Sequence, residues 1–182
     1  RSTASSFVPN IAPTPQKASP GKSGATALVA PAAMPLKEIP TDRSDVHPLG
    51  LCGRAIVKGL AWKHAETEHF VVHYTQEADA KPVMRSIECT YLVVAQALRL
   101  DPTTAKRKMH VFIFADTATW IRFTKALGMP PQVGGFAYKD ELLLGAHDDR
   151  DTYLKTLCHE AAHAIVAHFY PGRRWPLWLT EG

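Results

Sequence analysis

The chain has little cysteine, no long apolar run and no strong charge of either sign, and each absence excludes a class of protein. Its three cysteines, Cys52, Cys89 and Cys158, show no CxxC spacing and cannot all pair with one another, so no disulfide framework is predicted. We interpret Cys158 as a small core residue of a helix. No apolar run approaches the roughly 18 residues that a transmembrane helix needs, which predicts no stable membrane insertion of this chain.

The excess of positive charge is small and scattered. Residues 51–182 contain 16 lysines and arginines against 14 acidic residues, which leaves a net charge of +2. Short basic clusters at 106–108 and 173–174 are typical of solvated surface, although the second could meet an acidic group of a substrate. The chain lacks the aromatic interleaving and the reader motifs of nucleic-acid-binding domains, so we predict no nucleic-acid partner.

Residues 1–50 differ in composition from the rest. They hold eight of the fourteen prolines, many Ala, Ser and Thr residues, and Phe7 as their one aromatic residue. Such a segment buries too little apolar surface to offset the entropy of ordering, which predicts a disordered tail or linker. A tether of this kind after a removed signal is common in exported bacterial proteins, so export to the periplasm or cell envelope is a hypothesis for the compartment.

From residue 51 onward the pattern is that of one globular domain. Apolar periodicity and turn signals predict, in order, a strand over 69–74, a helix over 80–100, a strand over 109–114 that is apolar enough to be central, a helix capped by Asp116, a hairpin of 135–138 and 141–144, and a helix from Asp149 or Asp151 to about 170. This order favours an α+β fold, with a mixed β-sheet, an edge hairpin and helices packed on it.

One motif indicates a chemistry. His159, Glu160 and His163 form an HExxH sequence within the last of these helices, and chance would place such a triplet in a chain of this composition only about 0.02 times. Because an α-helix turns about 100° per residue, the two histidines lie about 40° apart and one turn apart, within reach of one metal ion. Zinc accepts neutral imidazole nitrogen, and Glu160 beside the ligands is placed to act as the general base.

A catalytic zinc site needs a third protein ligand. After His163 the remaining Asp, Glu, Cys or His residues are His168 and Glu181. His168 lies about 140° around the helix and is predicted to point away from the metal. Glu181 falls in a segment that Pro176 could open as a new helix, and a helix folded back on the first would bring Glu181 to the zinc ion.

The HExxH motif, followed eighteen positions later by the glutamate of a Pro-x-Trp-Leu-x-Glu-Gly segment, resembles the gluzincin metallopeptidases, and most of all the bacterial peptidase MA-like group. The resemblance covers about residues 60–182 and implies a zincin-like fold, His159, His163 and Glu181 as zinc ligands, and Glu160 as base. In that group the glutamate helix continues past the glycine. We therefore expect 51–182 to be a zincin-like domain truncated at its C-terminal end.

In gluzincins an edge strand beside the metal binds the peptide substrate as an additional strand, and the resemblance suggests Gly135, Phe136 and Ala137 for this role. An edge hairpin whose glycines serve packing alone is the alternative. The sequence thus predicts a zinc-dependent hydrolase of peptide or protein substrates, with Glu160 activating water. The alternative function is an inactive zinc-binding structural or interaction module of the same fold. His69, His73, His110 and His147 are interpreted as structural or solvated residues.

Overall fold

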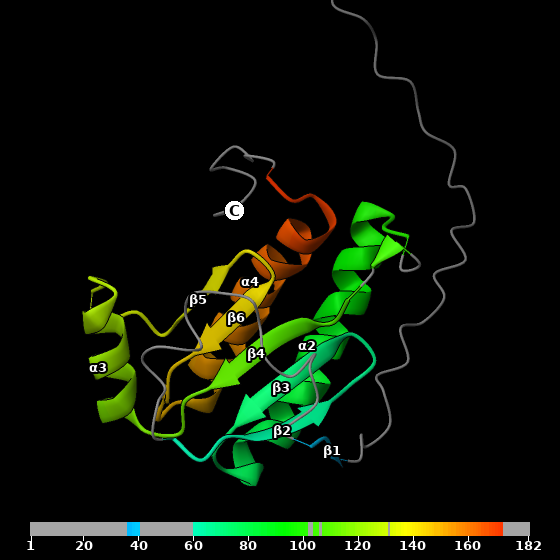
Figure 1. Cartoon of the computed structure of the whole chain (residues 1–182). Helices are drawn as coiled ribbons and strands as arrows, with labels where there is room; N and C mark the ends of the chain where they lie inside the picture. Colours follow the sequence, from blue (N-terminus) through cyan, green and yellow to red (C-terminus); the bar gives the residue numbers. More distant parts are fainter. Residues whose placement is uncertain (1–35, 41–59, 102–103, 106, 131, 173–182) are drawn as a thin grey trace, which may run out of the picture.

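One mixed β-sheet organises the part of the chain that the structure describes. The structure is a computed structural model, and it describes residues 36–40, 60–101, 104–105, 107–130 and 132–172. Six strands pair in the order β1-β2-β3-β4-β6-β5 (Figure 1). They are β1 (Lys37–Glu38), β2 (Lys63–Glu66), β3 (Phe70–Tyr74), β4 (Met109–Ile113), β5 (Gly135–Tyr138) and β6 (Glu141–Leu144). Neighbours among β3, β4 and β6 run parallel, and the other neighbouring pairs are antiparallel.

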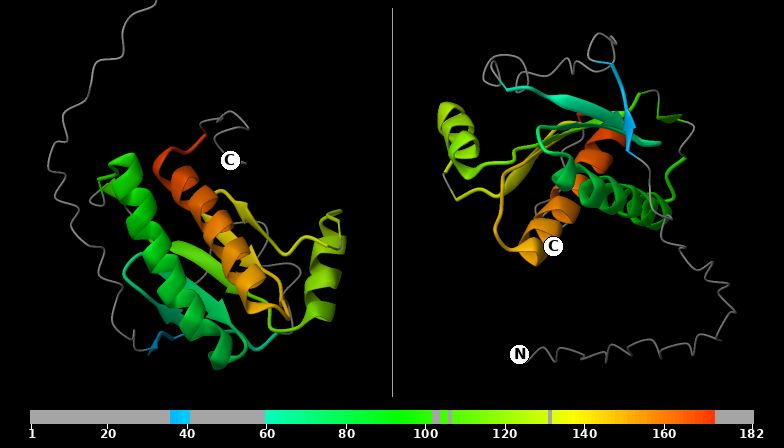
Figure 2. Two further views of the ribbon diagram at one scale, coloured as in Figure 1. Left: turned by 180° about the vertical axis from the view of Figure 1, so that it is seen from behind. Right: turned by 90° about the horizontal axis from the view of Figure 1, so that it is seen from below.

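Three helices cover this sheet: α2 (Glu77–Leu98), α3 (Thr117–Ala126) and α4 (Arg150–Phe169). The long helices α2 and α4 lie side by side over one face, and α3 stands apart beside the β5 and β6 end of the sheet (Figure 2). Among the described helices, none has the length and apolar content that crossing a bilayer requires. The α+β class expected from the sequence is therefore confirmed.

Strand alternation divides the apolar residues between the two faces of the sheet. Val72, Val111 and Leu142 point to the face covered by α2 and α4 and join the larger core. Phe112 and Leu143, one position along, point to the other face and pack with Trp120 and other aromatic residues in a smaller core. Both faces of the central strands are thus buried, which explains why β4 reads as a continuous apolar segment.

Several predicted boundaries agree closely with the structure. The hairpin strands match the predicted residues, β4 is central, and Asp116 caps α3 by accepting a hydrogen bond from the Thr119 N–H at 2.7 Å. Asp149, rather than Asp151, caps α4. The strands β1 and β2 are not among the predicted elements. Lys37 and Glu38 of β1 lie within the segment for which composition predicts disorder, and they pair with β2 beside the buried Ile39.

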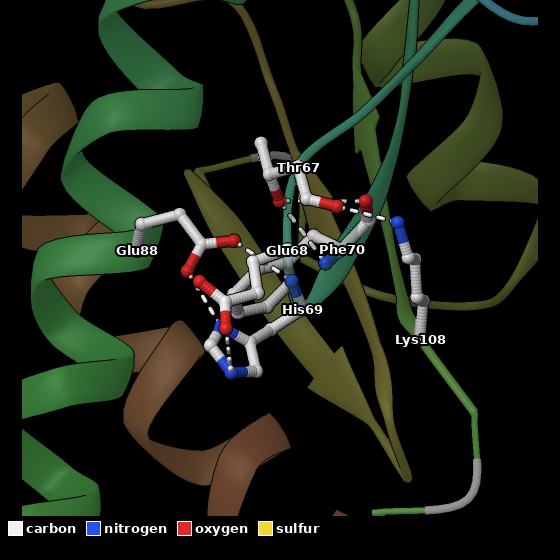
Figure 3. Close-up of polar contacts among 6 residues, drawn as sticks. All are labelled: Thr67, Glu68, His69, Phe70, Glu88 and Lys108. Atoms are coloured by element: carbon white, nitrogen blue, oxygen red, sulfur yellow. Dashed lines mark hydrogen bonds and ion pairs between the residues drawn. The ribbon is translucent and has the colours of Figure 1, made fainter. Parts of the chain in front are cut away.

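A contact between His69, in the turn before β3, and Glu88 joins this end of the sheet to α2 (Figure 3). His69 Nδ1 lies 2.7 Å from Glu88 Oε2, and the His69 backbone N–H donates to Glu88 Oε1 at 2.9 Å. The imidazole stacks on Tyr91, with ring centroids 3.6 Å apart. Burial raises the pKa of the Glu88 carboxyl, but the hydrogen bonds from His69 and Thr67 outweigh it and hold that pKa below its ordinary value.

We expect Glu88→Gln to destabilise the fold by about 1–3 kcal/mol at pH 7, because it removes a charged hydrogen-bond partner. Since the folded pKa of Glu88 lies below the unfolded value of 4.5, the carboxylate stabilises the fold above that pH and loses its contribution as the pH falls through the folded pKa. The cost of the substitution should therefore shrink toward acid pH. Urea unfolding of both chains at several pH values measures it, with Glu68→Gln, at an exposed position, as the control.

A cost of Glu88→Gln that stays constant as the pH falls below 4.5 would show that the carboxylate does not contribute as an ion. Glu68→Gln should change the free energy of unfolding by less than about 0.5 kcal/mol at any of these pH values.

Candidate metal centre

The HExxH residues lie on α4, and the sequence of this helix determines which of its faces is buried. Asp149 accepts a hydrogen bond from the Thr152 N–H at 2.9 Å and so fixes where the helix begins. Leu157, Ala161 and Ile165 then point into the main core. His159 lies on the exposed side of the helix, and Glu160 and His163 are half-buried.

The two histidines converge as the spacing predicts. His159 Nε2 and His163 Nε2 lie 3.0 Å apart, with ring centroids 4.6 Å apart and ring planes at 85°. Two nitrogens bound at 2.0–2.1 Å to one tetrahedral ion would be separated by about 3.3 Å. A small rotation of either ring gives this separation, so the pair fits a zinc ion as a donor set.

Glu160 lies between the helix and the edge of the sheet. Its Oε2 atom accepts a hydrogen bond from the backbone N–H of Ala137 in β5 at 3.0 Å. The Gly145 N–H donates to the Gly134 carbonyl at 2.9 Å, which makes this a hydrogen-bonded pair of the β5–β6 ladder. Because such pairs alternate along an antiparallel ladder, the backbone N–H and C=O groups of Gly135 and Ala137 point outward from the sheet.

The strand β5 is therefore an edge strand beside the HExxH helix, as the sequence predicts. The absence of a side chain at Gly135 permits α4 and β6 to approach β5 closely. A Cβ atom at this position would lie 3.0 Å from the Leu143 carbonyl oxygen and 3.1 Å from Thr156 Cγ2. Gly134 is less constrained, since its nearest neighbours would be in ordinary contact at 3.7 Å. The packing of Gly135 and the outward backbone of β5 coexist, so the packing of this glycine does not exclude substrate binding at the strand.

Phe136 differs from its two neighbours in β5. Its side chain packs with the aromatic residues of α3, at 6.0 Å from Trp120 and 6.3 Å from Phe123 between ring centroids. Its backbone faces Leu143 of β6 in the ladder. Of the three residues suggested for substrate binding, Gly135 and Ala137 are the two whose backbone points away from the sheet.

The third predicted ligand, Glu181, lies outside the described residues. Within the described ranges, no group of three or more His, Cys, Asp or Glu side chains is arranged to hold a metal ion. His168 is turned away from the pair, as predicted: its Nδ1 atom lies 3.5 Å from Asp140 Oδ2. Burial raises the pKa of the Asp140 carboxyl. The hydrogen bond from His168 and the charge of Arg107 outweigh this effect and hold that pKa below its ordinary value.

The prediction that Cys158 is a core residue of this helix is wrong. Cys158 is exposed, because the core-facing residue at this level of α4 is its neighbour Leu157, about 100° away around the helix. The thiol is not part of the buried packing of the helix.

The sequence suggests only structural or solvated roles for His73 and His110 and does not single out His64, and the structure brings these three histidines together. His64 Nδ1 lies 2.8 Å from His73 Nδ1, and His73 Nε2 lies 2.9 Å from His110 Nδ1. The signal that could have revealed this cluster is the position of each histidine on one face of its strand. Using this signal requires that β2 be predicted and that its pairing with β3 be known.

No protein-family model, curated protein or solved structure matches this chain. The functional assignment therefore depends on the residues and the geometry of α4 and β5.

Proposed function

We propose that this chain is a zinc-dependent peptidase of the gluzincin type. The observation that carries the proposal is the convergence of His159 Nε2 and His163 Nε2 to 3.0 Å beside Glu160, which itself reaches the edge strand. A metal-binding pair, a carboxylate outside that pair and an outward-facing strand are the parts that hydrolysis of an extended peptide needs. All three lie on two adjacent elements, α4 and β5.

In this proposal His159, His163 and Glu181 would hold the zinc ion. Bound zinc would act as a Lewis acid toward the scissile carbonyl and would make water a stronger nucleophile near neutral pH. Neutral imidazoles keep such an ion electrophilic, and one carboxylate ligand partly balances its charge.

Glu160 would accept the proton of the attacking water and deliver it to the leaving amine. Its carboxylate has two oxygens, and the Ala137 N–H occupies Oε2. The carboxylate can transfer the proton while the hydrogen bond to β5 holds the side chain in orientation. The backbone of the edge strand thus acts as the positioning partner of the base.

The substrate would bind as an added antiparallel strand on β5. The outward N–H and C=O groups of Gly135 and Ala137 supply main-chain hydrogen bonds, which tolerate many side chains. The Ala137 N–H remains with Glu160, so the substrate would use the N–H of Gly135 and the outward C=O groups of Gly135 and Ala137.

The same hydrogen bond favours a second candidate function, an inactive zinc-binding structural or interaction module. A carboxylate held by the Ala137 N–H could serve only to fix β5 against α4. Chelation distinguishes the two functions. A structural zinc site should unfold when the metal is removed, whereas a peptidase should lose hydrolysis with a smaller loss of folded structure.

We expect the purified chain to contain close to one zinc ion per molecule. His163→Ala should lower zinc affinity by more than the roughly 10–100-fold that loss of an outer-sphere partner costs, because it removes a ligand itself. Glu181→Ala should also lower it. Elemental analysis after dialysis against a weak chelator measures the content of each variant.

His168→Gln is the matched control, because His168 lies on the same helix but is turned toward Asp140. This variant should keep its zinc. Wild-type protein without near-stoichiometric zinc, or equal zinc content in wild type and His163→Ala, would contradict the assignment of the metal site.

A further inference from the structure

Three histidines, two of them buried and His110 half-buried, form a chain of imidazoles on the face of the sheet opposite α2 and α4. His64, His73 and His110 come from the adjacent strands β2, β3 and β4, and His64 lies directly across the ladder from His73. The relative exposure of His64 is 7% and that of His73 is 1%. His73 also stacks on Phe112, with ring centroids 4.3 Å apart, so the central ring is held in place.

Both nitrogens of His73 face another imidazole nitrogen, at 2.8 Å from His64 Nδ1 and 2.9 Å from His110 Nδ1. A hydrogen bond between two such nitrogens contains one proton, because two N–H groups would repel and two lone pairs would not bond. The two contacts therefore take two protons in total. The outer nitrogens of His64 and His110 add at most one proton each.

This count limits how far the folded cluster can be protonated. Three neutral imidazoles carry three protons, and the cluster with both contacts intact can carry at most four. The folded protein thus accepts at most one proton beyond the neutral state. The three histidines of an unfolded chain, with pKa values of about 6.5, accept three.

Two carboxylates of the described residues, Glu66 and Glu141, lie beside the cluster, and neither changes this limit. Glu66, on the same strand as His64, is held by Lys37 and Lys108. Glu141 of β6 lies directly across the ladder from His110 and can balance the one extra charge. A counter-charge favours that single proton, but the two nitrogen contacts still exclude the next two.

We propose that His64, His73 and His110 form an acid-sensitive element of the fold, which opens when more than one additional proton binds to the cluster. The unfolded chain then binds up to two protons more than the folded chain. Stability must therefore rise with pH through the histidine range and fall on acidification. The inference is independent of the proposed peptidase function.

The test is urea unfolding of the full chain between pH 7.5 and 5, compared with the double variant His64→Gln, His110→Gln. As the pH falls below about 6.5, the cluster should raise the unfolding constant of the wild type by up to about a hundredfold per pH unit. The variant keeps one histidine of the three, so its corresponding change should be no more than about tenfold. The α4 histidines and the other titratable groups are common to both chains, so their contributions cancel when the two pH dependences are compared. Equal pH dependence of the two chains would overturn the proposal.

A measurement on wild-type protein alone keeps the proposal testable if the double variant does not fold. Nitrogen-15 NMR of the histidine rings in folded protein should show the three residues taking up one proton together between pH 7.5 and 5.5. Three complete, independent titrations in the folded chain would overturn the proposal.

Discussion

Glu160→Gln should lower kcat/KM for peptide hydrolysis by between about a hundredfold and ten-thousandfold, the contribution that a positioned general base makes. The amide keeps an oxygen that can accept the Ala137 N–H, so β5 and α4 should stay in place. Zinc content should also be unchanged, because Glu160 is assigned no role as a ligand. Hydrolysis of a peptide library, followed by mass spectrometry, together with elemental analysis of the same preparation, measures both properties.

The matched control is Glu68→Gln, which removes a carboxylate at an exposed position in the turn between β2 and β3. Its kcat/KM should equal that of wild type. Full activity in Glu160→Gln would contradict the role of Glu160 as base. A loss of both zinc and activity in Glu160→Gln would instead assign the carboxylate to the support of the metal site.

Gly145→Ala should destabilise the fold by about 2–4 kcal/mol, through overpacking and the loss of a buried hydrogen bond. A Cβ atom at this position would lie 2.5 Å from Trp120 Nε1 and 2.6 Å from Trp120 Cδ1. The indole must then move, and it would lose its bond from Nε1 to the Val133 carbonyl, 2.6 Å long. Urea unfolding at pH 7.5 measures the change, and the near-ultraviolet circular dichroism of the tryptophan should weaken with it.

Gly134→Ala is the control for this substitution, because it lies on the same hairpin and its Cβ atom would meet its neighbours at 3.7 Å or more. We expect a change in the free energy of unfolding of less than about 1 kcal/mol. Equal stability of the two alanine variants would show that Trp120 can repack without cost, and that α3 is not fixed by this contact.

Local patterns predicted elements that depend on few neighbours. The hairpin strands follow from two apolar runs around Lys139 and Asp140, and Lys139 adopts the positive φ of 58° that the tight turn requires. Asp116 and Asp149 accept hydrogen bonds from N–H groups three residues ahead, so their capping role can be predicted from the sequence. The predicted edge position of β5 is also found in the sheet.

Elements that depend on distant partners were missed or misjudged. The strand β2 has a polar, short sequence, and it is a strand because β3 and β1 pair with its two sides. Without β2, the contact between His64 and His73 could not be foreseen. Cys158 was assigned to the core because periodicity alone does not say which stripe of α4 meets the sheet, and Leu157 takes that place.

The sequence by itself determined the chemistry that we propose for α4, because the spacing of His159 and His163 on a helix fixes their convergence through local geometry. The tertiary structure decided what surrounds that chemistry. Only packing could bring the Ala137 N–H to Glu160 and set three strand histidines within hydrogen-bonding distance. The physical reason is that i to i+4 relations are set by the helix itself, whereas contacts between strands depend on pairing and register across the whole sheet.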